Sequence, residues 1–251
     1  MKKVCYLLFL LATSFLVGQN NTAQNFEKAN KNYKEGNYEL ALDLYKQIEA
    51  GNAVSSELYY NMANSYYKLN RVGQTIYYYE KALQLDPLNE DAANNLTFAR
   101  RMTIDTIEEL PKTFLQKIEN NYIQKLSYTQ WSILAIVCSF LAAICFLLFY
   151  ISSISNRKRL YFLLSIFSCI LLAISLSISY TQHTKRKEIK TAIIFSSKIS
   201  VNNSPTLNSE EIFVLHEGTK IMILDSVDNW KKIKLADGKT GWVSADALKE
   251  L

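Results

Sequence analysis

The sequence predicts a multidomain protein in which an all-α domain of helical repeats, a two-helix transmembrane hairpin and a small all-β barrel follow one another. Three observations predict this order. A motif recurs at a fixed spacing in the first part of the chain, two charge-free apolar runs occupy the middle, and short β-rich runs with turn signals follow Lys190. These patterns are typical of stacked helix pairs, membrane spans and a small barrel, respectively.

The beginning of the chain resembles a secretory signal. Met1-Lys2-Lys3 supplies a basic start, Val4–Val17 is apolar, and Gly18–Asn21 is a polar exit. These are the parts of a signal peptide, which we place at residues 1–19. No small-residue cleavage motif precedes Ala23, so an uncleaved anchor is the alternative. Cys5 lies before the apolar run, which argues against a lipoprotein signal.

Residues 22–108 are predicted to form the repeat domain. Ala29–Lys34 recurs as Ala63–Lys68, and the same spacing relates Tyr38, Ala41 and Tyr45 to Val72, Thr75 and Tyr79. Because small and aromatic residues recur at helical spacing, each unit is predicted to be two antiparallel helices, with turns at Gly36-Asn37 and Asn70-Arg71. This pattern resembles the tetratricopeptide repeat, whose unit has about 34 residues. A further first helix at Glu90–Met102 gives about two and a half repeats.

The resemblance implies a concave groove lined by the first helices. Its predicted partner-binding residues are Asn30, Tyr33, Lys34, Tyr60, Asn64, Tyr67, Lys68 and Arg101. An amide can donate to and accept from a peptide bond, so Asn30 and Asn64 fit contacts with a ligand backbone. Members that clamp peptide tails carry basic residues at the positions of Phe26, Asn94 and Phe98, so capture of a C-terminal carboxylate is not expected here. The alternative is that these polar groups form a solvated face and the tyrosines are packing.

Residues 129–182 are predicted to form the transmembrane hairpin, with spans at 131–150 and 160–180. Each run has about the 20 residues that a helix needs to cross the hydrocarbon core. Neither contains Asp, Glu, Lys, Arg or His, so the hairpin is predicted to be an anchor and not an ion pathway. Ser127–Gln130 offers a capping box for the first span. Small residues form a stripe on each helix, and these stripes are predicted to face each other or a partner's helices: Ser132, Ala135, Ser139 and Ala142, and Ser165, Ser168, Ser175 and Ser179.

Residues 109–128 connect the repeats to the hairpin. Apolar residues recur at helical spacing from Phe114 to Leu126, among lysines and asparagines. This pattern predicts an amphipathic linker helix, either at the membrane interface or as a soluble connection.

The charges around the hairpin do not decide its orientation. Arg157–Arg159 lie in the turn between the spans, whereas Lys185–Lys187 and Lys190 follow the second span. The predicted signal peptide would export the repeat domain, and the hairpin would return the C-terminus to the same side. We therefore expect an inner-membrane protein whose two soluble domains are periplasmic.

Residues 190–251 are predicted to form the barrel. The strand candidates are 191–195, 211–215, 220–224, 230–235 and 240–243. Asp237-Gly238 between two of them is a hairpin signal. The succession of Leu215–Thr219, Asn229–Ile233 and Asp237–Val243 resembles bacterial SH3-like domains, which implies binding of cell-wall peptides or proteins. Trp230 and Trp242 are either a ligand surface or part of the barrel core and rim.

Composition argues against chemistry in the soluble parts. Cys5 lies in the predicted signal, and the other three cysteines lie in the predicted spans, which leaves no thiol elsewhere. His183 and His216 are the only histidines, too few for a structural metal site. We expect no catalytic residues, metal or cofactor, and no enzyme activity. The net charge is +5, and the basic residues gather at the flanks of the predicted spans. This position favours lipid headgroups over nucleic acid as a partner.

The order of these parts, together with Asn89–Arg101, resembles the BatE-type proteins of the aerotolerance operon. The resemblance implies partners with von Willebrand A domains and, indirectly, a MoxR-type ATPase. The first hypothesis is therefore a membrane-anchored scaffold that binds proteins through the repeat groove. The alternative is an anchor that binds peptidoglycan through the SH3-like domain.

Overall fold

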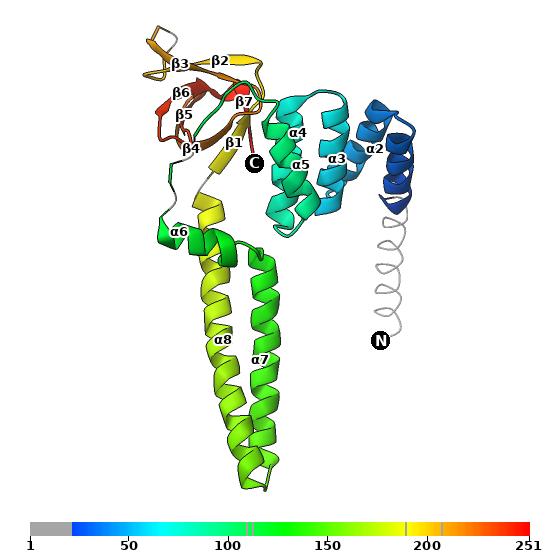
Figure 1. The fold of residues 1–251 in the computed structure, drawn as a ribbon, viewed down its shortest axis with the longest axis vertical. Coiled ribbons are helices and arrows are strands. Elements are labelled where there is room, and N and C mark those ends of the chain that lie inside the picture. Colours follow the sequence, from blue (N-terminus) through cyan, green and yellow to red (C-terminus); the bar gives the residue numbers. More distant parts are fainter. Residues whose placement is uncertain (1–21, 109, 112, 189, 207) are drawn as a thin grey trace, which may run out of the picture. The chain divides into compact units, whose positions relative to one another are not determined.

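The computed structural model describes residues 22–251 apart from 109, 112, 189 and 207, so the predicted signal peptide lies outside the described residues. The chain forms two compact units. The first contains the described residues up to Leu85, Asn89–Glu108 and Thr191–Leu251, and the second contains Asp86–Leu88 and Glu109–Lys190. The predicted fold class is confirmed, because helical repeats, two long apolar helices and an antiparallel β domain are all present (Figure 1).

The repeat domain is a row of antiparallel helices. Residues 22–34 are helical, and α2 (Tyr38–Ala50), α3 (Ser56–Lys68), α4 (Val72–Leu85) and α5 (Glu90–Arg100) follow. Gly36 has a φ of 85°, and Asn70, at the same position of the next repeat, has a φ of 56°. Both predicted turns therefore use the same left-handed residue, a conformation that Asn tolerates better than most side chains.

The helices pack at small side chains. Ala29, Ala41, Ala63, Thr75 and Ala82 are all fully buried. The ends of the helices are fixed by capping side chains: Ser55 accepts a hydrogen bond from the Leu58 amide, and Asn89 accepts one from the Ala92 amide. The helix predicted at Glu90–Met102 ends at Arg100, because a turn follows it.

The β domain is an antiparallel sheet with strand order β3-β2-β6-β5-β4-β1-β7 among the described residues. Its strands are β1 (Lys190–Ile194), β2 (Lys198–Asn202), β3 (Glu211–His216), β4 (Lys220–Val227), β5 (Trp230–Lys234), β6 (Thr240–Ser244) and β7 (Leu248–Glu250). The five predicted strands are present, but β2 and β7 were missed. β2 buries only its last two residues and β7 has three residues, so neither leaves a hydrophobic pattern in the sequence.

The second unit contains the hairpin of α7 (Tyr128–Ile151) and α8 (Ser155–Glu188), which run side by side (Figure 1). The predicted capping box is confirmed. The Ser127 hydroxyl accepts from the Gln130 amide at 3.3 Å, and the Gln130 side chain accepts from the Ser127 amide at 2.8 Å.

Small side chains line the seam between the two helices. Ala135, Cys138, Ala142 and Cys145 are buried on α7, and Ser165, Ser168, Ser175 and Ser179 are buried on α8. The predicted stripes therefore face each other, except that Cys138 takes the place expected for the exposed Ser139. The Ser165 hydroxyl donates to the Ala142 carbonyl at 3.2 Å, and the hydroxyls of Ser132 and Ser179 are 2.7 Å apart. Such hydroxyls join helices in an apolar surrounding.

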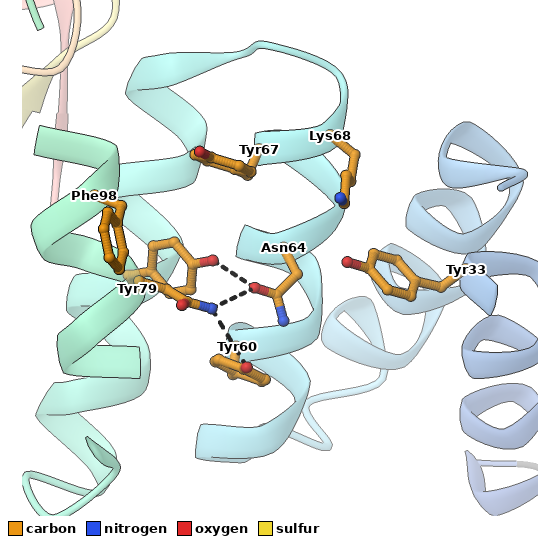
Figure 2. A pocket seen from close by; sticks show the side chains of 8 residues that line it. Tyr33, Tyr60, Asn64, Tyr67, Lys68, Tyr79 and Phe98 are labelled. Carbon is orange, nitrogen blue, oxygen red and sulfur yellow. Dashed lines mark hydrogen bonds between the residues drawn. The ribbon is translucent and has the colours of Figure 1, made fainter. Parts of the chain in front are cut away.

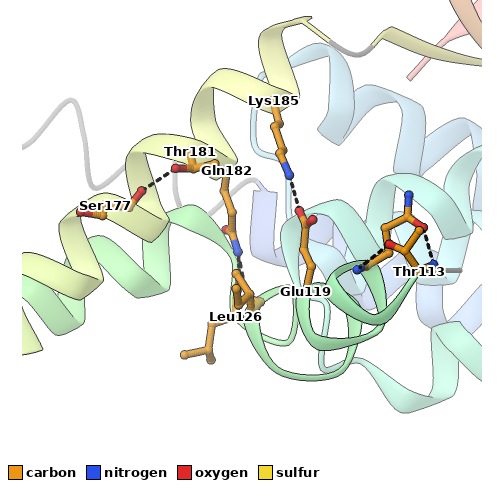
Figure 3. A network of polar contacts seen from close by, with 9 residues as sticks. Thr113, Glu119, Leu126, Ser177, Thr181, Gln182 and Lys185 are labelled. Carbon is orange, nitrogen blue, oxygen red and sulfur yellow. Dashed lines mark hydrogen bonds and ion pairs between the residues drawn. The ribbon is translucent and has the colours of Figure 1, made fainter.

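The linker is less regular than the predicted amphipathic helix over 109–128. It contains α6 (Phe114–Ile118) and a turn of π-helix, η1 (Glu119–Ile123). Its end is tied to the hairpin, since Trp131 Nε1 and Gln182 Nε2 both donate to the Ile123 carbonyl. Lys185 Nζ lies 2.6 Å from Glu119 Oε1 (Figure 3). The two bonds to Ile123 occupy a backbone carbonyl that a continuous helix would have used itself.

Both hairpin helices are long and apolar enough to cross a membrane. Only 22% of the most apolar window of α7 and 17% of that of α8 is buried. A core helix of a soluble domain would bury most of such a surface. The exposed Ile, Leu and Phe side chains therefore need an apolar surrounding that the described residues do not provide.

In the first unit, the β domain packs against α4 and α5. Glu80 on α4 is nearly buried, and its two carboxylate oxygens lie 2.6 Å from Lys220 Nζ and 2.7 Å from an Arg100 nitrogen. After α5, Asp105 accepts from the His216 amide at 2.7 Å and from the Thr219 hydroxyl at 2.6 Å. Carboxylates therefore join the two domains.

Both carboxylates are held in their charged form. Burial alone would raise the pKa of Glu80, but Lys220 and Arg100 outweigh burial and lower it below the usual range. Burial likewise opposes the charge of Asp105, and its bonds to Thr219 and His216 lower the pKa of Asp105 overall. Because its pKa is lower in the folded than in the unfolded state, each carboxylate stabilises the folded protein fully above its ordinary pKa. This stabilisation is lost as the pH falls toward the lowered pKa of the folded state.

We predict that Glu80→Gln lowers the thermal unfolding midpoint of the first unit near neutral pH. The difference from the wild-type chain should stay constant down to about pH 5 and shrink below about pH 4, where the unfolded carboxyl also becomes protonated. Thermal melts in detergent across this pH range measure the difference. A difference that grows on acidification would contradict the role of the charged carboxylate.

Candidate groove for a protein partner

A pocket of about 270 Å³ opens on the first helices of the repeats (Figure 2). It is lined by Tyr33, Tyr60, Asn64, Tyr67, Lys68, Tyr79, Asn95 and Phe98. The helix of residues 22–34 and α3 supply the residues up to Lys68, α4 supplies Tyr79, and α5 supplies the last two. The pocket is thus built from successive repeats, and its walls are mainly aromatic.

Asn64 is at the centre of a hydrogen-bond network in this pocket. Its side-chain carbonyl accepts from the Tyr79 hydroxyl and from Asn95 Nδ2, the latter at 3.1 Å (Figure 2). Burial raises the pKa of Tyr79, so its phenol stays protonated and donates. Asn95 Nδ2 also lies 3.4 Å from the Tyr60 hydroxyl. The carbonyl of Asn64 is therefore occupied by the protein itself.

The same network occurs one repeat earlier. Asn30 Oδ1 accepts from the Tyr45 hydroxyl at 2.6 Å and from Asn61 Nδ2 at 3.2 Å. Each set joins the two helices of one repeat to the first helix of the next. Sequence reasoning missed Asn61 and Asn95, although their separation by one repeat length was a readable signal.

Five of the eight groove residues predicted from the sequence line the pocket: Tyr33, Tyr60, Asn64, Tyr67 and Lys68. Asn30 lies in the equivalent network of the first repeat, and Arg101 lies over the Phe98 ring at 5.2 Å. Lys34 is exposed at the end of its helix, outside the pocket lining. Phe98, whose position the repeat resemblance also places in the groove, lines the pocket as well, and the structure adds Tyr79 and Asn95.

The pocket can bind an extended peptide by three kinds of contact. Asn64 Nδ2 has no acceptor among the described residues, so it can donate to a ligand carbonyl. Tyr67 and Phe98 are exposed by 39% and 54% and offer aromatic surface. The exposed Lys68 adds a cation at the edge. An amide donor and aromatic walls are contacts that suit a peptide backbone and discriminate little between side chains.

The β domain carries a second polar and aromatic surface. The strand register pairs Trp230 with Ser244 and Lys232 with Trp242. The neighbouring positions Ile233 and Val243 are fully buried in the core. Because side chains alternate between faces, Trp230, Lys232 and Trp242 all lie on the outward face. Lys232 Nζ lies 5.9 Å from the centre of the Trp242 ring. Neither tryptophan is a core residue.

Among the residues that the structure describes, no group of three or more His, Cys, Asp or Glu side chains could hold a metal ion. His216 Nδ1 instead lies 2.7 Å from Asp105 in the contact between the domains. His216 and Asp105 therefore bind each other. The surfaces that remain open to a partner are the pocket and the outward face of Trp230, Lys232 and Trp242.

Two segments match known families. Residues 56–89, which contain α3 and α4, match the tetratricopeptide repeat, and residues 201–249 match the bacterial SH3 domain. Both are interaction domains without catalytic activity. A comparison with curated proteins found none that matches the chain. The matched repeat supplies most of the pocket lining, and the matched β domain carries the outward tryptophans, so each surface lies on a domain of a known interaction class.

We predict that Asn64→Ala lowers the free energy of unfolding of the first unit by about 1–3 kcal/mol, because it leaves the buried Tyr79 hydroxyl without its acceptor. Lys68→Ala, on the same helix and without a partner among the described residues, should change it by about 0.5 kcal/mol or less. Urea unfolding followed by circular dichroism compares the two. Equal effects would contradict the network's structural role.

Proposed function

We propose that this protein is a membrane-anchored scaffold of the bacterial cell envelope that binds protein partners through the repeat groove. The observation that carries the proposal is the pocket across successive repeats, in which Asn64 presents an amide donor between aromatic walls. The internal network fixes the position of that donor before any ligand arrives. Preorganisation of this kind reduces the entropy lost on binding.

The hairpin serves as the anchor in this proposal. The outer surfaces of α7 and α8 are apolar, and their shared seam is closed by small residues. Export by the predicted signal peptide would place both soluble domains in the periplasm and the hairpin in the inner membrane. The charge-free spans support anchoring and give no support to transport.

The cellular role follows from the resemblance to BatE-type proteins. On that basis we propose that the scaffold acts in an aerotolerance or stress-related membrane complex. Its partners would be membrane proteins with von Willebrand A domains and, indirectly, a MoxR-type ATPase. The match of residues 56–89 to a protein-interaction repeat supports protein partners as a class.

Peptidoglycan binding by the β domain is the second candidate function. It is favoured by the outward face of Trp230, Lys232 and Trp242, and by the match to the bacterial SH3 domain. Tryptophan rings can stack on sugar rings, and a lysine can pair with the carboxylates of wall peptides. The two candidate functions use different surfaces, so they can be tested separately.

A photocrosslinking amino acid at Tyr67, in native membranes, tests the first function. We expect it to capture a defined set of envelope proteins, and Lys68→Ala with Tyr60→Ala to reduce this capture severalfold. The same crosslinker at Lys31, an exposed position with an exposed ion-pair partner, is the matched control.

Sedimentation with purified peptidoglycan, with and without Trp230→Ala and Trp242→Ala, tests the second candidate function. Capture at Tyr67 that equals capture at Lys31 would refute groove binding, and tryptophan-dependent sedimentation would then favour the wall.

A further inference from the structure

The two repeats differ at one face of their second helices. Positions 73, 77 and 80 on α4 correspond, one repeat earlier, to positions 39, 43 and 46 on α2. In the first repeat these positions are occupied by Glu39, Asp43 and Lys46, and all three are exposed. In the second repeat they are occupied by Gly73, Tyr77 and Glu80, and all three are buried. The spacing between these positions places them on one side of the helix. Among the described residues, the first repeat thus shows this face without a domain packed on it.

Gly73 allows the β domain to approach the start of α4. Its amide donates to Glu217 Oε1 at 2.8 Å. A Cβ atom at this position would lie 2.9 Å from Glu217 Cγ and 3.2 Å from the Ile194 carbonyl oxygen. A carboxylate at a helix N-terminus also interacts favourably with the helix dipole. Glycine at position 73 is therefore needed for contact with the β domain, whereas Glu39 at the same place in the first repeat is exposed.

Tyr77 supplies the apolar part of the contact. Its ring meets Phe195 edge-on with centroids 5.6 Å apart, and Lys249 Nζ lies 4.7 Å from its centre. Ile193 belongs to the same buried cluster as the repeat residues. A tyrosine at 77 thus joins the core of the repeats to β1 and β7, where Asp43 in the first repeat faces solvent.

The turn between β3 and β4 fits the end of the repeat array. Gly218 has a φ of 88°, and a Cβ atom there would lie 2.8 Å from Thr103 and 2.9 Å from Ile76. Asp105 holds the flanking His216 amide and Thr219 hydroxyl. The backbone of this turn therefore lies directly against α4 and the segment after α5.

We infer that the SH3-like domain is the built-in cap of the repeat array, docked on the face of α4 marked by Gly73, Tyr77 and Glu80. The third repeat has a first helix, α5, and the next helix in the described part of the chain, α6, belongs to the second unit. A repeat array needs a cap because each unit buries its apolar face only against a neighbour. The β domain covers the face of α4 whose counterpart on α2 is exposed, and its β3–β4 turn packs against Ile76.

Docking of the cap also positions one wall of the groove. Arg100 on α5 and Lys220 on β4 share the carboxylate of Glu80. Asn95 and Phe98, which line the pocket, lie on the same short helix as Arg100. Loss of the cap would loosen α5 and thereby the groove. This consequence for binding rests on the proposed function, whereas the docking itself does not.

Hydrogen exchange of the full chain in detergent micelles tests the cap. The triple variant Gly73→Glu, Tyr77→Asp, Glu80→Lys gives the second repeat the residues that the first repeat carries at the same positions, so the helix tolerates them. We expect exchange about tenfold faster or more in residues 90–100 and 211–219, because both are held by the docking contacts. Asp43→Tyr, the reverse change in the uncapped first repeat, is the matched control and should leave both segments unchanged. Peptides from residues 22–34 and from α2, which lie in the same unit but outside the docking contacts, report on general destabilisation of that unit.

A charge reversal provides the second arm. Glu80→Lys alone should accelerate exchange in both segments, and addition of Lys220→Glu should restore slow exchange. Unchanged exchange in a folded triple variant would overturn the inference. If the triple variant loses its helical signal, the charge pair decides: restoration by Lys220→Glu supports the cap, and no restoration overturns it. The groove is scored separately by Tyr67 crosslinking, so a cap without partner capture would refute only the proposed function.

Discussion

The buried carboxylate of Glu80 is the interaction on which the first unit depends. An ionised side chain in a buried position is costly unless its partners are present in good geometry. Here the partners come from two other elements, since Lys220 lies on β4 and Arg100 on α5. The charge therefore specifies which surfaces meet. An apolar contact of the same area would hold the domains together but would allow them to slide or rotate.

This constraint connects packing to binding. The pocket is completed by α5, a helix of 11 residues that would be marginal alone. Its inner face packs on the repeats and its Arg100 end is tied to the β domain through Glu80. Within the pocket, the Asn64 carbonyl is occupied by Tyr79 and Asn95, so the amide donor points in a fixed direction. The groove is thus a product of the contacts behind it.

The hairpin follows a different physical rule. In apolar surroundings, burying apolar side chains between two helices gains little free energy. The helices therefore associate by close packing and hydrogen bonds. The serines of α8 and the alanines and cysteines of α7 permit that approach, and the Ser132–Ser179 pair joins the two ends. The outer surfaces then remain apolar, which suits an anchor.

Local patterns in the sequence predicted much of this structure. The repeat spacing indicated the helix pairs and the turn at Asn70, and the Ser127–Gln130 box and both seams were readable because they depend on residues close in the chain. The strands β2 and β7 were missed, since short strands that bury so few side chains leave no period. The linker was predicted as one helix because its apolar spacing is helical, but bonds from Trp131 and Gln182 end it early.

The contact between the repeat domain and the β domain could not be predicted from the sequence for a different reason. Glu80 and Lys220 are 140 residues apart, and nothing local marks them as a pair. The same is true of Asp105 and His216, 111 residues apart. One signal lies in the repeat itself. Position 46 is a lysine and the equivalent position 80 is a glutamate, and this reversal of charge indicates different surroundings in the second repeat. Sequence reasoning therefore placed two separate domains where the structure has one unit.

The most direct test of this account is the distance between the two domains. Spin labels can be attached to cysteines introduced at Lys31 and Lys239, whose side chains are 76% and 66% exposed, after the four native cysteines are replaced by alanine. Pulsed electron paramagnetic resonance of the full chain in lipid nanodiscs then measures the distribution of distances. If the β domain is fixed to the repeats through Glu80, the distribution is single and narrow, and it is the same in nanodiscs and in detergent. A broad distribution, as tethered independent domains would give, would contradict this account.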